Sequence, residues 1–273
     1  MLKDGHLYSY SQLSSVDECP YSFYLQKIEL DEDGRPLKQQ DNFFAEHGSL
    51  MHKVLEEWAR GNISLNEMPD EYTRLYPGMV HTPPPPYMSK YASKAYDVGL
   101  WYCKDFRGFD GYDIVSAEER FRINLPLTDG TTREFVGVVD LILKDQETGG
   151  LVIMDHKSKS AKEFVKVRDE MYRQQYLYAA YVIEKYGVQP ERLAFNLFKE
   201  NGMIDERPFD KEEYQQTLQW ATDKILEIEN RDFLEWLDQK EEPDFFCNEI
   251  CSVRAYCPNG SLKPTPKGRK RKA

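Results

Sequence analysis

The sequence predicts a mixed α/β fold, in which helices flank a central sheet. Along the 273 residues, the spacing of apolar side chains changes several times between a helical period and the two-residue period of strands. Short segments with the composition of hairpin turns separate the predicted strands. No apolar run approaches the roughly 20 residues that a membrane span needs. The hydrophobic content of 40% suffices for one large domain or two small ones.

The N-terminal part of the chain is predicted to be helical. Apolar and aromatic residues recur at helical spacing over 8–29, 43–60 and 88–107. The intervening stretch 68–88 contains four consecutive prolines, which exclude a helix or a central strand there. We therefore expect 68–88 to be a loop or a linker across the surface.

Three strands are predicted in the middle of the chain, over 113–125, 133–144 and 150–157. The segments TDGTT and DQETGG between them have hairpin-turn chemistry. We therefore expect consecutive strands to pair as antiparallel hairpins.

The remainder of the chain returns to helix, strand and helix. A helix over 166–187 ends at Gly187, a typical C-cap residue, and RLAFNLFKE at 192–200 is predicted to be a fourth strand. A helix over 210–237 and a cysteine-rich segment follow. The predicted core order is therefore helix, three strands, helix, strand.

Charge is distributed unevenly. The net charge is −11, but the end LKPTPKGRKRKA carries six basic and no acidic side chains, which leaves 30 basic against 47 acidic residues elsewhere. An acidic body with a basic tail fits a metal-dependent nuclease that grips DNA locally. The alternative is a solvated end without a binding role. We expect 259–273 to form a basic, disordered tail.

The N-terminal sequence and the cysteine count both bear on the compartment. MLKDGHLYSYSQ lacks the apolar segment of a secretory signal, so we expect an intracellular protein. In a reducing compartment, cysteines are metal ligands or buried thiols more often than disulfides. Cys103 lies on a predicted amphipathic helix and is expected to be a buried thiol.

The stretch VIMDHKSKS combines a buried-strand pattern with three ionisable residues. On a strand, Asp155 and Lys157 point to the same side, while the side chain of His156 points away and its carbonyl lies between them. On the preceding strand, FVGVVDLIL places Asp140 in an apolar run, where a carboxylate is costly unless it is paired or bound to a metal. In a hairpin, Asp140 and Asp155 converge on one point.

Such a pair of carboxylates, with a carbonyl and water, makes a hard-oxygen site suited to Mg²⁺ or Mn²⁺. A lysine beside it can orient or activate a water molecule, or stabilise developing phosphate charge. A single acid at a strand end is common and has no catalytic meaning by itself. The partner Asp140, in its apolar setting, makes the catalytic interpretation the better one.

Four of the five cysteines form a second pattern. Cys247, Cys251 and Cys257 have the spacing C-x3-C-x5-C, and Cys19 lies 228 residues before the first of them. The spacing alone suits zinc and an iron–sulfur cluster equally well.

Several motifs together resemble the PD-(D/E)XK nuclease superfamily, in its RecB-like branch and the CRISPR-adaptation exonuclease group. GVVD and VIMDHKS resemble its GxxD and (D/E)xK signatures, GSLMHKVLEEW resembles its upstream histidine helix, and RQQYLYAAY resembles its QxxxY motif. LSSVDECPYSFYLQKI and CNEICSVRAYC resemble its N-terminal and C-terminal cysteine elements. The resemblance covers residues 8–258.

The resemblance implies a restriction-endonuclease-like core, with a mixed sheet of about four strands flanked by helices. It implies one domain over 1–258, made of a helical part (8–107), a nuclease core (113–200) and a C-terminal helix with the cysteine cluster (210–258).

It also implies site residues and cofactors. His52 joins Asp140, Asp155 and the His156 carbonyl at the metal, and Lys157 acts on the water, with Gln174 and Tyr178 contacting DNA or supporting Lys157. Of two adjacent acids, we expect Glu119 rather than Glu118 to face the site. The cysteines Cys19, Cys247, Cys251 and Cys257 are implied to hold a [4Fe–4S] cluster, with zinc as the alternative. The more usual C-terminal spacing is C-x2-C-x5-C, which puts the cluster type in question.

The function implied is a Mg²⁺- or Mn²⁺-dependent deoxyribonuclease, most often an exonuclease, in recombination, repair, phage DNA processing or CRISPR adaptation. Its substrate would be single-stranded DNA or DNA ends. The chain has no P-loop pattern, so a helicase activity must come from a partner, and a recombinase or integrase partner is equally compatible. The alternatives are a non-catalytic module that binds DNA ends and a structural iron–sulfur or zinc adaptor.

Overall fold

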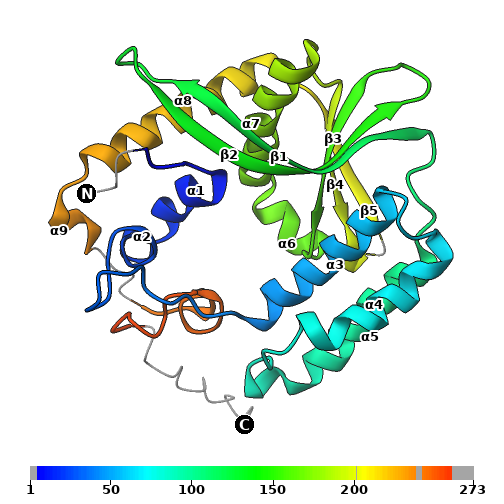
Figure 1. Cartoon of the computed structure of the whole chain (residues 1–273), viewed down its shortest axis with the longest axis horizontal. Coiled ribbons are helices and arrows are strands. Elements are labelled where there is room, and N and C mark those ends of the chain that lie inside the picture. Colours follow the sequence, from blue (N-terminus) through cyan, green and yellow to red (C-terminus); the bar gives the residue numbers. More distant parts are fainter. Residues whose placement is uncertain (1–4, 201, 238–241, 260–273) are drawn as a thin grey trace, which may run out of the picture.

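The computed structural model describes residues 5–200, 202–237 and 242–259. At its centre lies a five-stranded sheet whose strands follow one another in sequence order (Figure 1). The strands are β1 (Tyr112–Pro126), β2 (Thr132–Asp145), β3 (Leu151–Lys157), β4 (Arg192–Leu197) and β5 (Met203–Pro208).

The sheet is mixed. Neighbouring strands are antiparallel except for β3 and β4, which are parallel and are joined by helices α6 (Ala161–Lys166) and α7 (Arg168–Tyr186). Parallel strands need such a crossover because the chain must return to the same end of the sheet. The predicted mixed α/β class, with a sheet flanked by helices, is confirmed, and so is the hairpin pairing of the first three strands.

The sequence predicts about four strands, and the edge strand β5 is the one that it misses. β5 pairs antiparallel with β4, and none of its six residues is buried. Its segment MIDERP therefore lacks the run of apolar residues that identifies the inner strands. The neighbouring strand supplies its hydrogen bonds, which no local pattern reveals.

Helices α7 and α8 (Lys211–Asn230) cover one face of the sheet, and α1 (Tyr10–Glu18) and α2 (Pro20–Lys27) pack beside them (Figure 1). Burial of apolar side chains between these layers is the main stabilising contribution. The side chains that share this core include Phe23, Phe135, Val139, Ile153, Tyr176, Leu177, Val182, Phe195 and Ile225.

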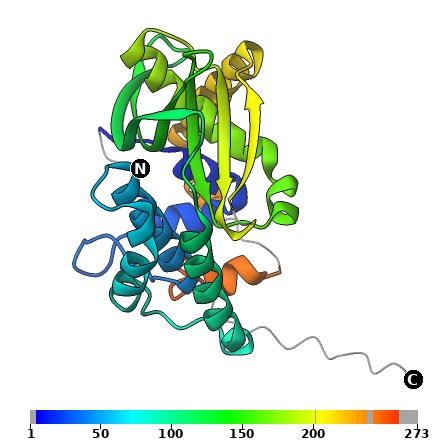
Figure 2. The same ribbon diagram turned by 90° about the vertical axis from the view of Figure 1, so that its right-hand side faces the viewer.

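Three further helices form a helical arm at one end of the sheet, as Figure 2 shows. They are α3 (Phe43–Ala59), α4 (Met68–Met79) and α5 (Ser89–Asp105). They share a second core with the residue that follows β4, formed by Leu50, Met51, Val54, Leu55, Met68, Tyr72, Tyr102, Cys103, Phe106 and Phe198. This packing holds the inner face of α3 against the sheet.

The predicted helix over 8–29 is two helices, α1 and α2, with a break at Cys19 and Pro20. A proline disfavours the helical conformation of the residue before it, and Cys19 is extended, with φ −165° and ψ 101°. Pro20 then occupies the first turn of α2, where its missing N–H costs nothing. The break places the Cys19 side chain at the N-terminus of α2.

The prediction of a loop over 68–88 is wrong for its first half, which forms α4. Pro69 lies in the first turn, where proline is tolerated, and Met68 and Tyr72 are fully buried in the helical arm. Residues 80–85 are irregular, and Pro86 begins a short 3-10 helix. Tertiary burial outweighs the weak helix propensity of this stretch.

Other boundaries shift by shorter lengths. The predicted helix over 166–187 begins earlier, as α6, and restarts as α7 after Val167. The predicted helix over 210–237 is α8 followed by the short α9 (Phe233–Trp236). The other short helices are η1 (Leu65–Glu67), η2 (Pro86–Met88), η3 (Phe198–Glu200) and the π-helical turn η4 (Phe246–Ile250).

The remaining expectations on organisation stay predictions. Apart from Asn259, the basic tail 259–273 lies outside the described residues. The division of 1–258 into three parts of one domain is likewise not tested by the fold. Within the described part of the chain, no helix has both the length and the apolar composition that a membrane crossing requires.

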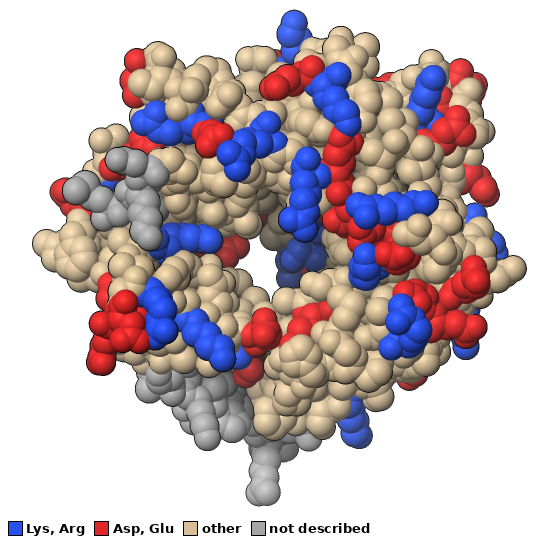
Figure 3. Space-filling view, in the orientation of Figure 1, with Lys and Arg blue, Asp and Glu red and all other residues tan. Residues whose placement is uncertain are grey.

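The elements are arranged around a central opening (Figure 1), which Figure 3 shows in the space-filling view with Lys and Arg side chains at its edge. The chain closes around it through its C-terminal segment. The N–H of Gln40, just before α3, donates to the Ser252 carbonyl at 2.6 Å. On the other side, Leu25 of α2 packs against Val253. The C-terminal segment therefore connects α2 to the start of α3.

Candidate active site

The two predicted carboxylates meet where β2 and β3 pair. The register Leu141↔Met154 places Asp140 and Asp155 next to each other along the hairpin. The Oδ2 atom of Asp140 accepts the backbone N–H of His156 at 2.8 Å. Both carboxylates are buried, with 8% and 3% of their surface exposed. Two acids held this close in the protein interior require a compensating cation.

Helix α3 brings His52 to the same point. Its Nε2 atom donates to the His156 carbonyl at 2.9 Å, and its Nδ1 atom lies 3.3 Å from Oδ2 of Asp140 and 3.7 Å from Oε1 of Glu118. Because a carbonyl can only accept, Nε2 carries a proton, while Nδ1 points to the carboxylates and offers a lone pair to a metal once it has given up its own proton. This is the tautomer that a metal ligand needs.

Glu118, rather than Glu119, is the acid of β1 that faces the site. Among the residues that the structure describes, Glu118 is the one non-glycine residue with a positive φ, at 48°. This conformation breaks the alternation of β1, and Glu119 instead pairs with Lys185 and Tyr181 of α7. The expectation for Glu119 is therefore wrong, because alternation holds only for regular strands. Such a strained backbone is a feature of functional sites.

Lys157, Gln174 and Tyr178 form a hydrogen-bonded network with Asp155. The Nζ atom of Lys157 lies 2.8 Å from Oδ2 of Asp155 and donates to Oε1 of Gln174 at 3.0 Å. The Nε2 atom of Gln174 donates to Asp155 Oδ1 at 3.3 Å and to the Tyr178 hydroxyl at 2.7 Å. Gln174 and Tyr178 therefore support the lysine and the carboxylate, as their four-residue spacing on α7 allows.

The electrostatics of the site reflect crowded negative charge. Burial and the nearby charge of Asp140 raise the pKa of Asp155 to about 6, although Lys157 opposes the shift. Burial also disfavours the charged form of His52, but Asp140 and Glu118 outweigh it and raise the pKa of His52 well above 6.5. The same histidine overcomes the burial of Asp140 and lowers the pKa of that carboxyl. Opposed shifts of this kind mark functional sites.

The donor set fits a divalent cation. One atom each from His52, Glu118 and Asp140 lie within 4.8 Å of one another. Asp155 Oδ2 is buried and has no hydrogen bond of good geometry, although the Lys157 ammonium lies nearby. One nitrogen and several carboxylate oxygens suit Mg²⁺ or Mn²⁺. A groove of about 480 Å³, lined by Gly48, His52, Lys53, Glu56, Glu118 and Ser158, gives access to the cluster.

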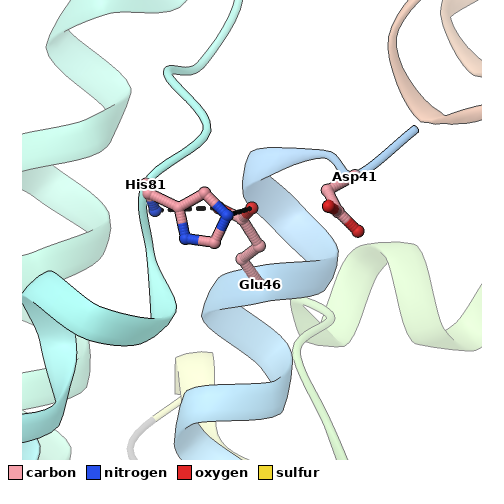
Figure 4. A group of neighbouring side chains, drawn as sticks. All are labelled: Asp41, Glu46 and His81. Atoms are coloured by element: carbon pink, nitrogen blue, oxygen red, sulfur yellow. Dashed lines mark hydrogen bonds and ion pairs between the residues drawn. The ribbon is translucent and has the colours of Figure 1, made fainter.

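A second cluster of Asp41, Glu46 and His81 is shown in Figure 4. Here the buried Glu46 accepts the backbone N–H groups of His81 and Thr82 at 3.1 and 2.8 Å, and the Thr82 hydroxyl at 2.6 Å. Its carboxylate thus fastens the segment after α4 to α3. This explains a buried acid at this position without a metal.

The four patterned cysteines line one cavity. Cys19 from the start of α2 faces Cys247, Cys251 and Cys257 of the C-terminal segment across it, with Phe246 and Val253 among the other lining residues. The backbone N–H of Ser22 points to Cys19 Sγ at 3.4 Å, which suits a thiolate at a helix N-terminus. The donor set fits a tetrathiolate metal centre.

Cys103 lies apart from these four, buried in the helical arm. Burial raises the pKa of its thiol to about 12. It is a buried thiol in an apolar environment, in agreement with the expectation from its helix.

Comparison with known proteins identifies the family. A sequence model of the PD-(D/E)XK nuclease superfamily matches residues 7–258. No curated protein matches the chain.

Among solved structures, a protein from Eubacterium rectale named as a putative exonuclease aligns over 83% of this chain and 82% of its own, with 13% identity and a TM-score of 0.40. The protein SSO0001 aligns over 78% of this chain and 96% of its own, with 15% identity and a TM-score of 0.33. Similarities this distant add nothing to the assignment. The family match alone covers nearly the whole chain, and the mixed sheet flanked by helices agrees with a restriction-endonuclease-like fold. The chain therefore belongs to the PD-(D/E)XK nuclease superfamily.

Proposed function

We propose that this protein is a Mg²⁺- or Mn²⁺-dependent deoxyribonuclease that acts as an exonuclease. The observation that carries the proposal is the convergence of His52, Asp140, Asp155 and Lys157 from three elements on one buried point. A nuclease needs such a set because phosphodiester hydrolysis requires charge stabilisation and an activated water molecule.

The proposed ligands of the divalent cation are His52, Asp140, Asp155 and the His156 carbonyl, with Glu118 as an addition from the structure. The carbonyl oxygen has two lone pairs, so it can accept from His52 and still face a cation. When bound, the cation supplies polarisation of the scissile phosphate and lowers the pKa of water. The residues themselves would hold this charge in place.

Lys157 positions the attacking water and offers a positive charge to the phosphate oxygens. Its ammonium is directed by Asp155 and Gln174, at 2.8 and 3.0 Å. Tyr178 in turn holds Gln174. Lysine suits this role because its three donors can serve the carboxylate, the amide and a reacting group together.

The central opening favours an exonuclease over an endonuclease. A single strand that passes through a closed ring must enter by an end, and the Lys and Arg side chains at the edge of the opening suit a phosphate backbone (Figure 3). Single-stranded DNA, or the single-stranded end of a duplex, is therefore the proposed substrate.

We also propose the RecB-like branch of the superfamily and a [4Fe–4S] cluster held by the four cysteines that line one cavity. The cluster would join α2 to the C-terminal segment and so stabilise the ring; zinc is the alternative metal. The proposed setting is the cytoplasm of a prokaryotic or phage-infected cell, in recombination, repair, phage DNA processing or CRISPR adaptation. The chain lacks a P-loop, so unwinding there would fall to a helicase partner.

The test is cleavage of end-labelled single-stranded DNA by the wild type with Mn²⁺ or with EDTA. We expect Mn²⁺-dependent loss of mononucleotides from a linear strand and none from a circular strand of the same sequence. Asp155→Ala should be inactive on both. Circles cut as fast as linear strands would contradict exonuclease action but keep the nuclease.

An inactive wild type that still binds DNA ends would instead favour the non-catalytic end-binding module. An inactive wild type without DNA binding would favour the structural adaptor.

A further inference from the structure

His156 is the residue through which strand β3 holds two of the proposed ligands. Its backbone N–H donates to Asp140 at 2.8 Å, and its carbonyl accepts from His52 at 2.9 Å. A small rotation of this one residue therefore displaces a carboxylate and an imidazole together. What fixes the orientation of His156 also fixes the geometry of the site.

The imidazole of His156 points away from the site, as strand alternation requires, and only 2% of its surface is exposed. On that side, its Nδ1 atom lies 3.0 Å from Nδ2 of Asn196. Asn196 is in register with His156 on the neighbouring parallel strand β4 and is fully buried. Phe109 lies parallel to the imidazole at 6.3 Å between ring centroids.

The side-chain amino group of Asn196 donates to two acceptors. Besides the histidine, Nδ2 donates to the hydroxyl of Tyr102, from α5, at 2.7 Å. The Oδ1 atom is buried and has no hydrogen bond. The amino group thus serves two buried acceptors, and an apolar side chain there would leave both the His156 ring nitrogen and the Tyr102 hydroxyl without this donor. The amide therefore fixes the His156 imidazole against β4 and α5.

We propose that Asn196 is a positioning residue for the divalent cation, which acts through the His156 imidazole on the peptide that holds Asp140 and His52. This inference rests on the proposed metal site. Residues that orient metal ligands from behind typically change metal affinity by about 10–100-fold when they are removed. Asn196 is not one of the proposed ligands, and its amide contacts the ring of His156 on the side away from the site.

The experiment measures Mn²⁺ binding by calorimetry in the absence of DNA, so that it does not depend on cleavage. Asn196→Leu keeps the branched shape of the side chain and removes the amide. We expect it to weaken Mn²⁺ binding about 10-fold or more, measured at a temperature at which it and the matched control are both fully folded. That control is Tyr102→Phe, which removes the other acceptor of the same amino group and should keep Mn²⁺ affinity within about twofold of the wild type.

A second variant keeps the test valid if Asn196→Leu fails to fold. Asn196→Ser is too short to reach the imidazole and should give the same loss of affinity. If Asn196 acts through the histidine, combining its substitution with His156→Leu should weaken binding no further than His156→Leu alone, because the two residues act as one unit.

Equal Mn²⁺ affinity in Asn196→Leu and the wild type would overturn the inference, and so would an equal loss in Tyr102→Phe, which would show a general effect of stability. Both results leave the nuclease proposal intact. A wild type that neither binds Mn²⁺ nor cleaves DNA would instead overturn the proposed function itself.

Discussion

At the scale of single residues, the charge of Asp155 opposes folding. Asp155 is buried beside Asp140, and its pKa is raised to about 6 from 3.8. Its carboxyl group therefore binds its proton more tightly in the folded than in the unfolded chain. The free energy of unfolding should therefore fall as the pH rises from about 4 to about 6. Above that range, the ionised carboxylate of Asp155 lowers the stability by its full amount.

Asp155→Asn should therefore abolish cleavage and still stabilise the metal-free protein at pH 8 by about 1–3 kcal/mol, since each pKa unit corresponds to about 1.4 kcal/mol. Thermal unfolding in EDTA at pH 8 and pH 3.5 measures this. The gain should vanish at the lower pH, where the carboxyl group is protonated in both states. A variant less stable than the wild type at pH 8 would show that Asp155 contributes to folding.

Gly137, the glycine of the GVVD motif, lies where neighbouring aromatic rings leave no room for a side chain. A Cβ atom there would lie 2.6 Å from Phe121 Cζ and 2.9 Å from Tyr178 Cε1. Tyr178 holds Gln174, which directs Lys157. The absence of a side chain on β2 thus lets the tyrosine of α7 reach the active site.

Gly137→Ala should destabilise the protein by about 1–3 kcal/mol, the usual cost of overpacking, and slow cleavage through the displaced tyrosine. Urea unfolding and a cleavage assay measure the two effects. Gly78→Ala is the control, because its Cβ would meet nothing within 4 Å on helix α4. Equal free energies of unfolding in Gly137→Ala and Gly78→Ala would show that Gly137 is not required by packing.

At the scale of elements, the irregular part of β1 decides which acid faces the site. The register shifts between Ile114 and Ser116, and Glu118 has a positive φ, so Glu118 faces His52 while Glu119 faces α7. Glu118→Gln should reduce cleavage about 10-fold or more, as expected for a group at a metal site. Glu119→Gln should leave cleavage unchanged, and a larger loss in Glu119→Gln would show that the two roles are exchanged.

The elements also show what a sequence can reveal. Asp140, Asp155 and Lys157 were predictable because an ionisable residue in an apolar strand is costly and therefore conspicuous. Helix α4 could not be predicted from the sequence, because its stability comes from Met68 and Tyr72, which pack against distant parts of the chain. The edge strand β5 could not be predicted either, because its hydrogen bonds come from the neighbouring strand β4. Asn196 gave a weaker signal, because burying an amide costs less than burying a carboxylate and its partner His156 is revealed only by the structure.

At the scale of the whole molecule, the proposed cluster closes the ring. Cys19 and the three C-terminal cysteines come from opposite ends of the chain, and closing so long a loop restrains the unfolded state strongly. Anaerobically purified protein should be brown, with about four irons per chain. Cys19→Ser or Cys257→Ser should lower thermal stability and solubility before they alter the active site.

Cys103→Ser is the control for that series and should leave the metal content unchanged, because Cys103 lies in the helical arm. Colourless protein with one zinc per chain would contradict the iron–sulfur cluster but support the assignment of the four cysteines as metal ligands. Stable, metal-free protein with these four thiols open to titration would contradict both metals.

We propose that the carboxylates and His52 hold a divalent cation and that cleavage by the bound cation depends on Lys157. This proposal is tested most directly by measuring Mn²⁺ binding and single-stranded DNA cleavage in Lys157→Ala. Because Lys157 contacts Asp155 and Gln174 but is not itself a ligand, Mn²⁺ should still bind. Cleavage should fall by about 100-fold or more, the usual size of a lost water-activating group. Cleavage at the wild-type rate in Mn²⁺ would contradict the account.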